Sequence, residues 1–445
     1  MADRSATVAR ALADALLAGP WELAAMTRRA QRAVGERRVW LRDLAHVSGR
    51  AYPSPPLDRP RELAALVAAC RPLVDRFEER RPPPAVRHWF LAPTAMGERR
   101  WPVVPLDTVR DLRDLLGLTL PDLRWLADVR GLERGAPEGP LRHYRYRWVP
   151  KGDGSGRLIE APKQTLKHIQ RVLLREILDR VPPDAHAHGF HPGRSALTFA
   201  AAHAGRPLVV RLDLEDFFSS VPAGRAFGVY RRCGYPEPVA HLLTGLTTNA
   251  VPSTVLAGAP RPLAAGDLDR WRRQARRLAA PHLPQGAPTS PAVANLAALR
   301  LDRRLAGLAG AAGLTYGRYA DDLALSSPHR LPAGQVARLL DAAAGIAAEE
   351  GFRLNASKTT VRHAGQRQRL VGLVVNERPT IGRHEYDRLR AILHNAARHG
   401  PAGQNRAGHA DFRAHLRGRV VWVEHVDPRR GARLRATFEQ IDWGG

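Results

Sequence analysis

The stretch that decides the fold of this chain is Arg318-Tyr319-Ala320-Asp321-Asp322-Leu323-Ala324-Leu325-Ser326, in which two adjacent acids lie between apolar residues. The pattern predicts a β-hairpin with strands at residues 314–319 and 323–326 and with the two carboxylates at its tip. Neighbouring carboxylates repel each other unless a cation offsets their charge, and Mg²⁺ prefers one or two carboxylates together with water and substrate phosphates. The tip therefore indicates phosphoryl-transfer chemistry, and an Asp-Asp turn without a role is the alternative.

A second acidic segment, Leu208-Val-Val-Arg-Leu-Asp213-Leu-Glu-Asp-Phe-Phe218, begins as a nearly continuous apolar strand. Such a strand is typical of a buried position in a sheet, and Asp213 lies where it ends. Carboxylates at the ends of buried strands commonly bind metals in α/β sites. Together with Asp321 and Asp322, Asp213 would complete three carboxylates for two Mg²⁺ ions that clamp an in-line displacement.

Two further segments have the composition of loops that contact nucleotides. Residues 144–163 predict two strands joined by the Gly-rich turn 152–156, with Lys151 and Arg157 on its two arms. These charges could fold over a triphosphate as the loop closes, whereas a surface hairpin with solvated charges is the alternative. Residues 283–295 form a Gly- and Pro-rich loop that begins a helix of small residues, so that a bulky planar group could lie against the backbone.

The composition indicates a polyanionic partner. The 445 residues include 69 Lys and Arg against 43 Asp and Glu, a formal net charge of +26. Most of the basic residues are Arg, which makes bidentate phosphate contacts, so nucleic acid is the expected partner and an anionic membrane surface the weaker alternative. No apolar run is long enough to span a membrane and the first residues lack the pattern of a signal peptide, so we expect a cytoplasmic protein without a membrane partner. Cys70 and Cys233 are too few for a disulfide framework or a Cys-based zinc site.

Residues 1–140 differ from the rest of the chain in their sequence pattern. The pattern predicts helices, and the segment contains no group of candidate catalytic residues. Their basic outer faces leave two roles open, a helical packing module or a surface that contacts nucleic acid. Helical patterns return near the end of the chain, beside a basic region that suits the backbone of a duplex. The expected helices cover residues 7–17, 21–34, 39–47, 61–80, 106–116, 120–129, 166–178, 383–398 and 411–422.

Four motifs occur in the order and at the spacing of the reverse transcriptase family. Tyr319-Ala-Asp-Asp322 resembles the YxDD box, and Asp213 to Phe218 resembles the first catalytic motif. Leu283-Pro-Gln-Gly286, followed by Ala-Pro-Thr-Ser-Pro, is similar to the nucleotide-site motif, and Asn355 to Thr359 is similar to the lysine motif. The resemblance covers about residues 141–440 and is closest to the retron type of bacterial reverse transcriptase.

This resemblance implies an α+β fold of the right-hand polymerase type. Residues 1–140 would be a helical N-terminal extension, residues 141–375 the fingers and a ferredoxin-like antiparallel palm, and residues 376–445 a helical thumb.

The resemblance also implies a role for each matched residue. The metal ligands would be Asp213, Asp321, Asp322 and the backbone carbonyl of Leu214, with two Mg²⁺ ions as the cofactor and Mn²⁺ as an alternative. Lys151 and Arg157 would contact the triphosphate, and Gln285 would contact the sugar of the incoming nucleotide. Phe218 would exclude the ribonucleotide 2′-OH, and Lys358 would be the general acid for the leaving pyrophosphate.

Two segments concern the retron type. Phe199-Ala-Ala-Ala-His203 keeps Ala200 and His203 of a motif that precedes the first catalytic strand in retron enzymes, with Phe199 in place of its Asn. Leu370-Val-Gly372 occurs where those enzymes carry Val-Thr-Gly. We expect contacts with nucleic acid from His203 and from the thumb residues Arg429, Arg430, Arg433 and Arg435.

The function implied is an RNA-directed DNA polymerase that copies part of a partner non-coding RNA into single-stranded DNA, in a role in antiphage defence. Its partners would be a structured RNA that supplies template and primer, the RNA–DNA duplex, dNTPs and an effector protein. The alternatives are a group II intron-like or other defence-associated reverse transcriptase, and an RNA-binding scaffold whose catalytic site is vestigial.

Overall fold

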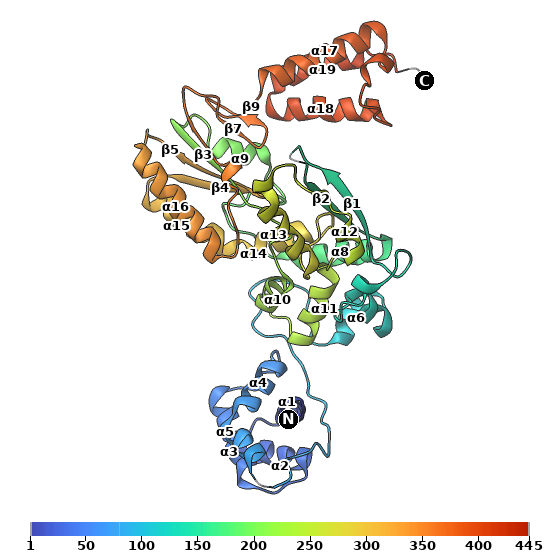
Figure 1. Cartoon of the computed structure of the whole chain (residues 1–445), viewed down its shortest axis with the longest axis vertical. Helices are drawn as coiled ribbons and strands as arrows, with labels where there is room; N and C mark the ends of the chain where they lie inside the picture. Colours follow the sequence, from blue (N-terminus) through green and yellow to red (C-terminus); the bar gives the residue numbers. More distant parts are fainter. Residues whose placement is uncertain (1, 80, 153, 444–445) are drawn as a thin grey trace. The chain divides into compact units, whose positions relative to one another are not determined.

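The computed structural model describes residues 2–79, 81–152 and 154–443, which form helices and small antiparallel sheets, so the fold is α+β (Figure 1). The chain divides into two compact units. The first unit contains Met1–Pro182 and Val221–Val293, and the second contains Pro183–Ser220 and Ala294–Gly445. This division crosses the expected boundaries at residues 140 and 375, because segments that are distant in the sequence pack together within each unit.

The first unit begins with a bundle of helices that has a core of its own. Leu12, Leu16, Leu41 and Leu63 are fully buried in this core, as the three-to-four spacing of apolar residues predicts. The expected helix at residues 61–80 is two helices, because Cys70 adopts an extended conformation and a proline follows it. The helices are α1 Ala2–Leu17, α2 Leu23–Val34, α3 Val39–Ala51, α4 Pro60–Ala69 and α5 Arg71–Glu78.

The rest of the first unit combines one β-hairpin with short helices. The expected hairpin is present, and its antiparallel strands β1 Tyr144–Pro150 and β2 Gly156–Pro162 pair along their whole length. Helix α6 begins at Val109 rather than at residue 106, because the Thr108 hydroxyl accepts a hydrogen bond from the Asp111 backbone in a capping box. The helices are α6 Val109–Leu116, α7 Leu120–Ala127, α8 Gln164–Glu176, α10 Ala223–Arg232, α11 Glu237–Thr247, α12 Ser253–Ala257 and α13 Leu268–Ala279, after which α14 Ser290–Ala297 follows in the chain.

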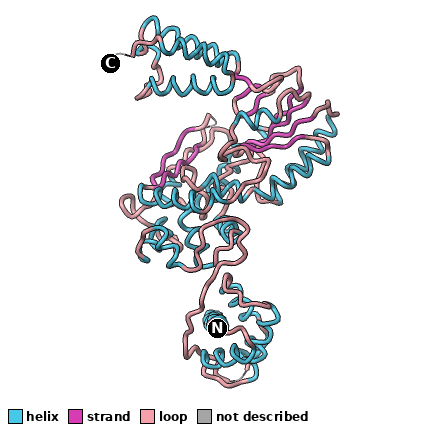
Figure 2. The backbone as a smooth tube through the Cα atoms, turned by 180° about the vertical axis from the view of Figure 1, so that it is seen from behind, coloured by secondary structure: helices cyan, strands magenta, loops and turns pink. Residues whose placement is uncertain are grey.

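The second unit is built on an antiparallel sheet with the strand order β4-β5-β3-β6, whose strands are drawn in magenta in Figure 2. The predicted buried strand and the predicted hairpin are both confirmed, since they are β3 and the pair β4 and β5. Helix α15 packs against β4 and also contacts α16. The elements are α9 Ala196–Ala202, β3 Leu208–Asp213, α15 Leu299–Ala311, β4 Thr315–Tyr319, β5 Asp322–Ser327, α16 Ala333–Glu349 and β6 Thr360–His363.

The second unit ends in a small three-stranded sheet and three helices. One of these helices was not expected, because the segment 428–439 is rich in Arg and contains few apolar residues. Asp427 caps it by accepting a hydrogen bond from the Arg430 backbone, and Pro428 takes the first helical position. The elements are β7 Arg369–Leu370, β8 Leu373–Val374, β9 Thr380–Ile381, α17 Arg383–His399, α18 Phe412–Val426 and α19 Pro428–Glu439.

Within the described ranges, no helix combines the length and the apolar character needed to cross a membrane.

Candidate catalytic site

Antiparallel pairing in the second unit brings the three predicted carboxylates together. Asp213 at the end of β3 lies directly opposite Asp322 at the start of β5. The Leu214 backbone N–H donates to the Asp321 carbonyl at 2.9 Å, which extends the pairing past the end of the strands. Two segments that lie about a hundred residues apart in the chain therefore place their acids at one edge of the sheet.

The carboxylates are less exposed than a simple hairpin tip would suggest. Asp213 is buried, with 3% of its surface accessible, and Asp321 and Asp322 are half-buried. Burial raises the pKa of Asp321, and the charges of Asp322 and Asp213 raise it further. Burial also raises the pKa of Asp322, against the opposing effect of Arg211. The site thus concentrates negative charge in a region with limited solvent.

Protein cations offset this charge. The Lys358 ammonium lies 2.8 Å from Asp213 Oδ1, so this lysine lies beside the carboxylates. Arg211 Nη2 lies 2.6 Å from Asp322 Oδ1, and Asn355 Nδ2 donates to Asp213 Oδ2 at 3.3 Å. The sequence interpretation missed Arg211 as part of the site. The sequence pattern could have indicated Arg211, because it is a basic residue in an otherwise apolar strand. It lies two positions before Asp213 and therefore on the same face of the strand.

The donor set suits a hard divalent cation. Carboxylate oxygens and a backbone carbonyl such as that of Leu214 are the ligands that Mg²⁺ prefers. In this structure Lys358 and Arg211 contact two of the three carboxylates. Over the described residues, accordingly, no three acidic, His or Cys side chains converge on one point where a metal could be held. The residues therefore fit a metal in their chemistry, although their side chains face protein cations.

A buried ion pair supports the turn that carries the acids. Arg318 and Asp302 are both fully buried, with Arg318 Nη2 at 2.7 Å from Asp302 Oδ2. Arg318 also donates to the Ala320 carbonyl at 3.2 Å and to Asn295 Oδ1 at 2.9 Å. Ala320 has φ +55°, a left-handed conformation that costs a non-glycine residue about 1 kcal/mol. The hydrogen bond from Arg318 helps to hold that conformation, and no local pattern around Asp302 or Asn295 indicated this role.

Aromatic rings surround the turn. The ring of Phe218 lies 6.1 Å from that of Phe190, which in turn lies 6.4 Å from the ring of Tyr319. Phe190 is half exposed and has φ +58°. The preceding Gly189 permits this approach, because a Cβ atom there would lie 2.7 Å from the Ala320 backbone nitrogen. The sequence interpretation named Phe218 but missed Phe190.

The predicted nucleotide contacts Lys151, Arg157 and Gln285 belong to the first unit. Lys151 and Arg157 lie at the end of the β1–β2 hairpin, where the Lys151 backbone N–H donates to the Ser155 carbonyl at 2.8 Å. Gln285 lies against β2, since the Glu160 backbone N–H donates to its carbonyl at 2.9 Å. The structure therefore groups these three residues on and beside one hairpin.

A buried polar network anchors the Gln285 loop, and the sequence interpretation did not include it. Glu160 Oε1 lies 3.0 Å from His282 Nε2, and Asn249 donates to the second oxygen of Glu160 at 2.7 Å. Both members of the Glu160–His282 pair have only 1% of their side-chain surface exposed. Burial alone would lower the pKa of His282, but the carboxylate of Glu160 outweighs it and the pKa is raised. A buried pair with this many partners ties the loop firmly to the hairpin.

His203 does not occupy the position expected of a residue that contacts nucleic acid. Its ring is fully buried, and Nδ1 lies 2.8 Å from the Ser326 hydroxyl. Burial lowers the pKa of His203 to about 3, so the ring is neutral at ordinary pH. A residue with no accessible surface cannot touch a polymer outside the protein, so we correct this expectation to a packing role beneath the sheet.

The four basic residues predicted for the end of the chain lie on α19 and differ in their surroundings. Arg435 forms an ion pair with Glu424 of α18. The guanidinium of Arg430 lies over the ring of Tyr386, 5.2 Å from its centre. Arg429 and Arg433 are exposed. The last two are therefore the better placed for contact with an external phosphate.

Comparisons with known proteins show which family this chain resembles. Residues 149–386 match the family model described as reverse transcriptase (RNA-dependent DNA polymerase). The retron Mx65 reverse transcriptase of Myxococcus xanthus is 40% identical over 328 residues, which cover 74% of this chain and 70% of that protein. The retron Ec86 reverse transcriptase of Escherichia coli is 32% identical over 287 residues, which cover 64% of this chain and 77% of that protein. The retron Mx162 reverse transcriptase of Myxococcus xanthus is 37% identical over 350 residues, or 76% of this chain and 67% of that protein.

The matched region contains the paired aspartates of β3 and β5, the lysine that contacts Asp213 and the loop of Gln285. The chain therefore belongs to the reverse transcriptase family of RNA-directed DNA polymerases and groups with its bacterial retron members.

Proposed function

We propose that this polymerase copies part of a structured non-coding RNA into single-stranded DNA in the cytoplasm, using dNTPs and two divalent cations. The observation that carries the proposal is the pairing of Asp213 with Asp322 across β3 and β5. We assign the metals, Mg²⁺ with Mn²⁺ as an alternative, to Asp213, Asp321, Asp322 and the carbonyl of Leu214. When bound, such ions neutralise the charge that develops on the triphosphate and align the attacking hydroxyl.

The side chains around the aspartates supply positioning and charge. Lys358 carries protons on Nζ beside Asp213 and can donate one to the leaving pyrophosphate. Phe218, supported by the ring of Phe190, would lie beneath the sugar and exclude a 2′-hydroxyl by its volume. Lys151 and Arg157 would hold the triphosphate and Gln285 the sugar, since phosphoryl transfer depends mainly on positioning and electrostatic stabilisation.

The likeness to right-hand polymerases assigns larger roles to the segments. The β1–β2 hairpin and its neighbouring helices would be the fingers, the four-stranded sheet the palm, and α17 to α19 the thumb. The thumb would hold the RNA–DNA duplex. We further propose an effector protein as a partner and a role in antiphage defence, in line with the retron relatives.

Substitution of the paired acids tests the proposal. Asp321→Asn and Asp322→Asn each remove negative charge needed for metal binding, so template extension with dNTPs and Mg²⁺ should fall by about 100-fold or more. RNA binding in a mobility-shift assay should stay near that of the wild type. Asp341→Asn, an exposed position on α16, is the matched control and should leave both unchanged. Extension at the wild-type rate by both variants would refute the metal assignment, and a wild-type protein that shifts RNA yet incorporates nothing would be a scaffold.

A further inference from the structure

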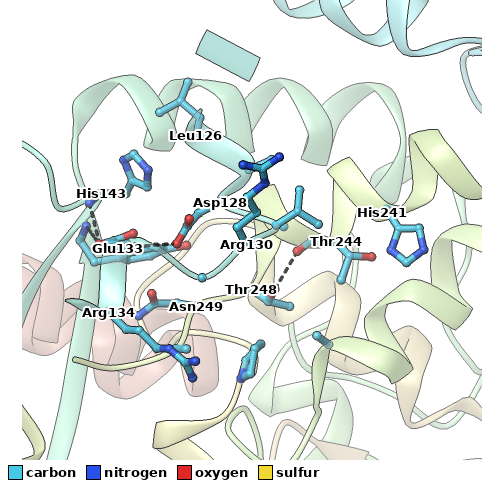
Figure 3. A pocket seen from close by; sticks show the side chains of 18 residues that line it. Leu126, Asp128, Arg130, Glu133, Arg134, His143, His241, Thr244, Thr248 and Asn249 are labelled. Carbon is cyan, nitrogen blue, oxygen red and sulfur yellow. Dashed lines mark hydrogen bonds between the residues drawn. The ribbon is translucent and has the colours of Figure 1, made fainter. Parts of the chain in front are cut away.

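An open cavity of about 830 Å³ lies in the first unit, beside α7, and most of its lining precedes the segment that matches the family model. Its lining includes Arg61, Arg124, Trp125, Arg130, Leu132 and Leu141. The adjoining cavity drawn in Figure 3 shares six lining residues with the larger one, namely Asp128, Val129, Arg130, Glu133, His143 and His241. Its volume is about 290 Å³. The mechanism proposed above uses none of these side chains.

The acids of the loop between α7 and β1 are already hydrogen-bonded to backbone amides. Asp128 accepts from the backbone N–H of Leu132 at 2.8 Å and of Glu133 at 2.9 Å. Glu133 accepts from the backbone N–H of His143 at 2.6 Å and of Tyr144 at 3.2 Å (Figure 3). Both carboxylates therefore stabilise the loop itself.

The basic side chains of the cavity are in a different situation. Arg124 and Arg130 are exposed, and neither forms an ion pair with any residue in the described part of the chain. Arg61 Nη1 lies 2.5 Å from His241 Nε2, and the Arg61 backbone N–H donates to Glu237 at 2.6 Å. The cavity thus presents the guanidinium groups of Arg124 and Arg130, which form no ion pair within the described residues and can bind an anionic ligand.

Apolar groups gather around the same cavity. Trp125 is 49% exposed, and Val129, Leu132 and Leu141 are between 56% and 70% exposed. Trp125 is held in place, because its ring packs edge-on against His143 at 4.5 Å and its carbonyl lies 2.9 Å from His143 Nε2. A fixed, exposed indole next to unpaired arginines combines a stacking surface with phosphate-binding groups.

We propose that this cavity binds a segment of single-stranded RNA, with one base stacked on Trp125 and the flanking phosphates at Arg124 and Arg130. Leu132 and Leu141 would cover the apolar edges of the stacked base. A protein segment would also bury the apolar groups, but two exposed arginines that form no ion pair within the described residues favour a ligand with a regular array of negative charges. The inference rests on RNA being a partner of the chain, as proposed above, and places a contact outside the family-matched region.

The test is the binding of a fluorescent eight-nucleotide oligouridine RNA to the full chain, followed by anisotropy. Trp125→Ala should weaken binding by about 10-fold, the scale of one lost stacking contact, while Trp125→Phe should retain most of the affinity. Arg124→Ala/Arg130→Ala should lower the slope of log affinity against log salt by about 1.4, because two contacts with a single strand are lost. Trp89→Ala, which removes an equally exposed Trp away from the cavity, is the matched control and should leave affinity unchanged.

Trp125→Leu separates the two classes of occupant. It should bind as weakly as Trp125→Ala if a base stacks on the indole, whereas binding at the wild-type level would indicate a merely apolar docking surface and overturn the proposal. Unchanged binding by both Trp125→Ala and Arg124→Ala/Arg130→Ala would also overturn it. Extension of a preannealed primer–template by the same variants measures catalysis separately from oligouridine binding. If the chain incorporates no dNTP, the proposed function fails, but a loss of oligouridine binding in Trp125→Ala would still support this inference.

Discussion

Asp322 accepts hydrogen bonds from Arg211, and Asp213 contacts the Lys358 ammonium and the Asn355 amide. At the scale of single residues these contacts matter because three carboxylates in a poorly solvated region repel one another. Each cation stabilises the ionised form of the carboxylate that it contacts. It does so without burying apolar atoms at the edge of the sheet where the acids lie. Loss of one member of such a partly buried pair would leave the other charge uncompensated, which is commonly more costly than the pair is stabilising.

Phe218 is expected to determine the choice of sugar. Phe218→Ala or Phe218→Val should raise the ratio of rNTP to dNTP incorporation by about 10-fold or more, because a smaller side chain leaves room for the 2′-hydroxyl. Steady-state extension with each nucleotide measures the ratio. Phe352→Leu is the control, since Phe352 stacks on Phe217 in the core and its loss should affect stability rather than selectivity. An unchanged ratio in both Phe218 variants would show that another residue selects the sugar.

Glu133 should make the loop between α7 and β1 sensitive to pH. Burial raises the pKa of Glu133 to about 7, against the lowering effect of two backbone hydrogen bonds. The folded state therefore binds a proton more tightly than the unfolded state, whose pKa is near 4.5. Stability from this group is fully present below about pH 4.5 and is lost as pH rises through about 7, by up to about 3 kcal/mol.

Hydrogen exchange at the amides of His143 and Tyr144 measures this effect, once rates are corrected for the pH dependence of intrinsic exchange. Protection should decrease between pH 5 and pH 8 in the wild type and stay nearly constant in Glu133→Gln. Glu138→Gln, at an exposed position in the same segment, should behave like the wild type. An equal pH dependence in all three proteins would contradict the assignment to Glu133.

At the scale of elements, α18 and α19 form a closely packed pair that presents arginines. Gly431 allows this packing, since a Cβ atom there would lie 2.2 Å from the Glu424 Cα. The ion pair between Arg435 and Glu424 joins the same two helices, and Leu434 is buried in the shared core. The arginines of α19 therefore divide into residues that hold the helix pair together and residues that face outward.

This division predicts different effects on nucleic-acid binding. Arg429→Ala/Arg433→Ala should lower the slope of log affinity against log salt by about 0.7 to 0.9 for each phosphate contact that is lost. Arg430→Ala/Arg435→Ala should instead lower the melting temperature with a smaller change in slope, because these side chains contact Tyr386 and Glu424. Salt titrations with cognate and scrambled RNA measure both variants. A loss confined to cognate RNA would indicate recognition of RNA structure, and unchanged slopes in both variants would leave only a solvated basic face.

At the scale of the whole molecule, the net charge of +26 favours any polyanion, whereas the catalytic edge and the cavity beside Trp125 require particular chemistry. We therefore expect the purified chain to retain one dominant non-coding RNA together with DNA complementary to part of it. Sequencing of the copurified nucleic acid measures this, with Asp321→Asn as the control that should retain the RNA without its DNA copy. A mixture that mirrors total cellular RNA would contradict a dedicated RNA partner.

Local patterns in the sequence determined much of the second unit. The two acids between apolar residues, Asp321 and Asp322, predicted the hairpin of β4 and β5. The apolar run before Asp213 predicted β3, because strand formation and burial leave a signal within a few residues. The order of the four motifs along the sequence indicated the reverse transcriptase family without any information on tertiary contacts. The Arg-rich helix α19 left a weaker local signal and was missed.

Only the tertiary structure decided which side chains meet. Arg211 reaches Asp322 across 111 positions of sequence, Asn249 reaches Glu160 across 89, and Arg318 reaches Asp302 through the packing of α15 on β4. The burial of His203 depends in the same way on strands that follow it in the chain. A local sequence pattern indicates whether a segment is a helix or a strand and which of its residues share a face. A buried ion pair or a stacked ring depends instead on how elements from distant parts of the chain pack.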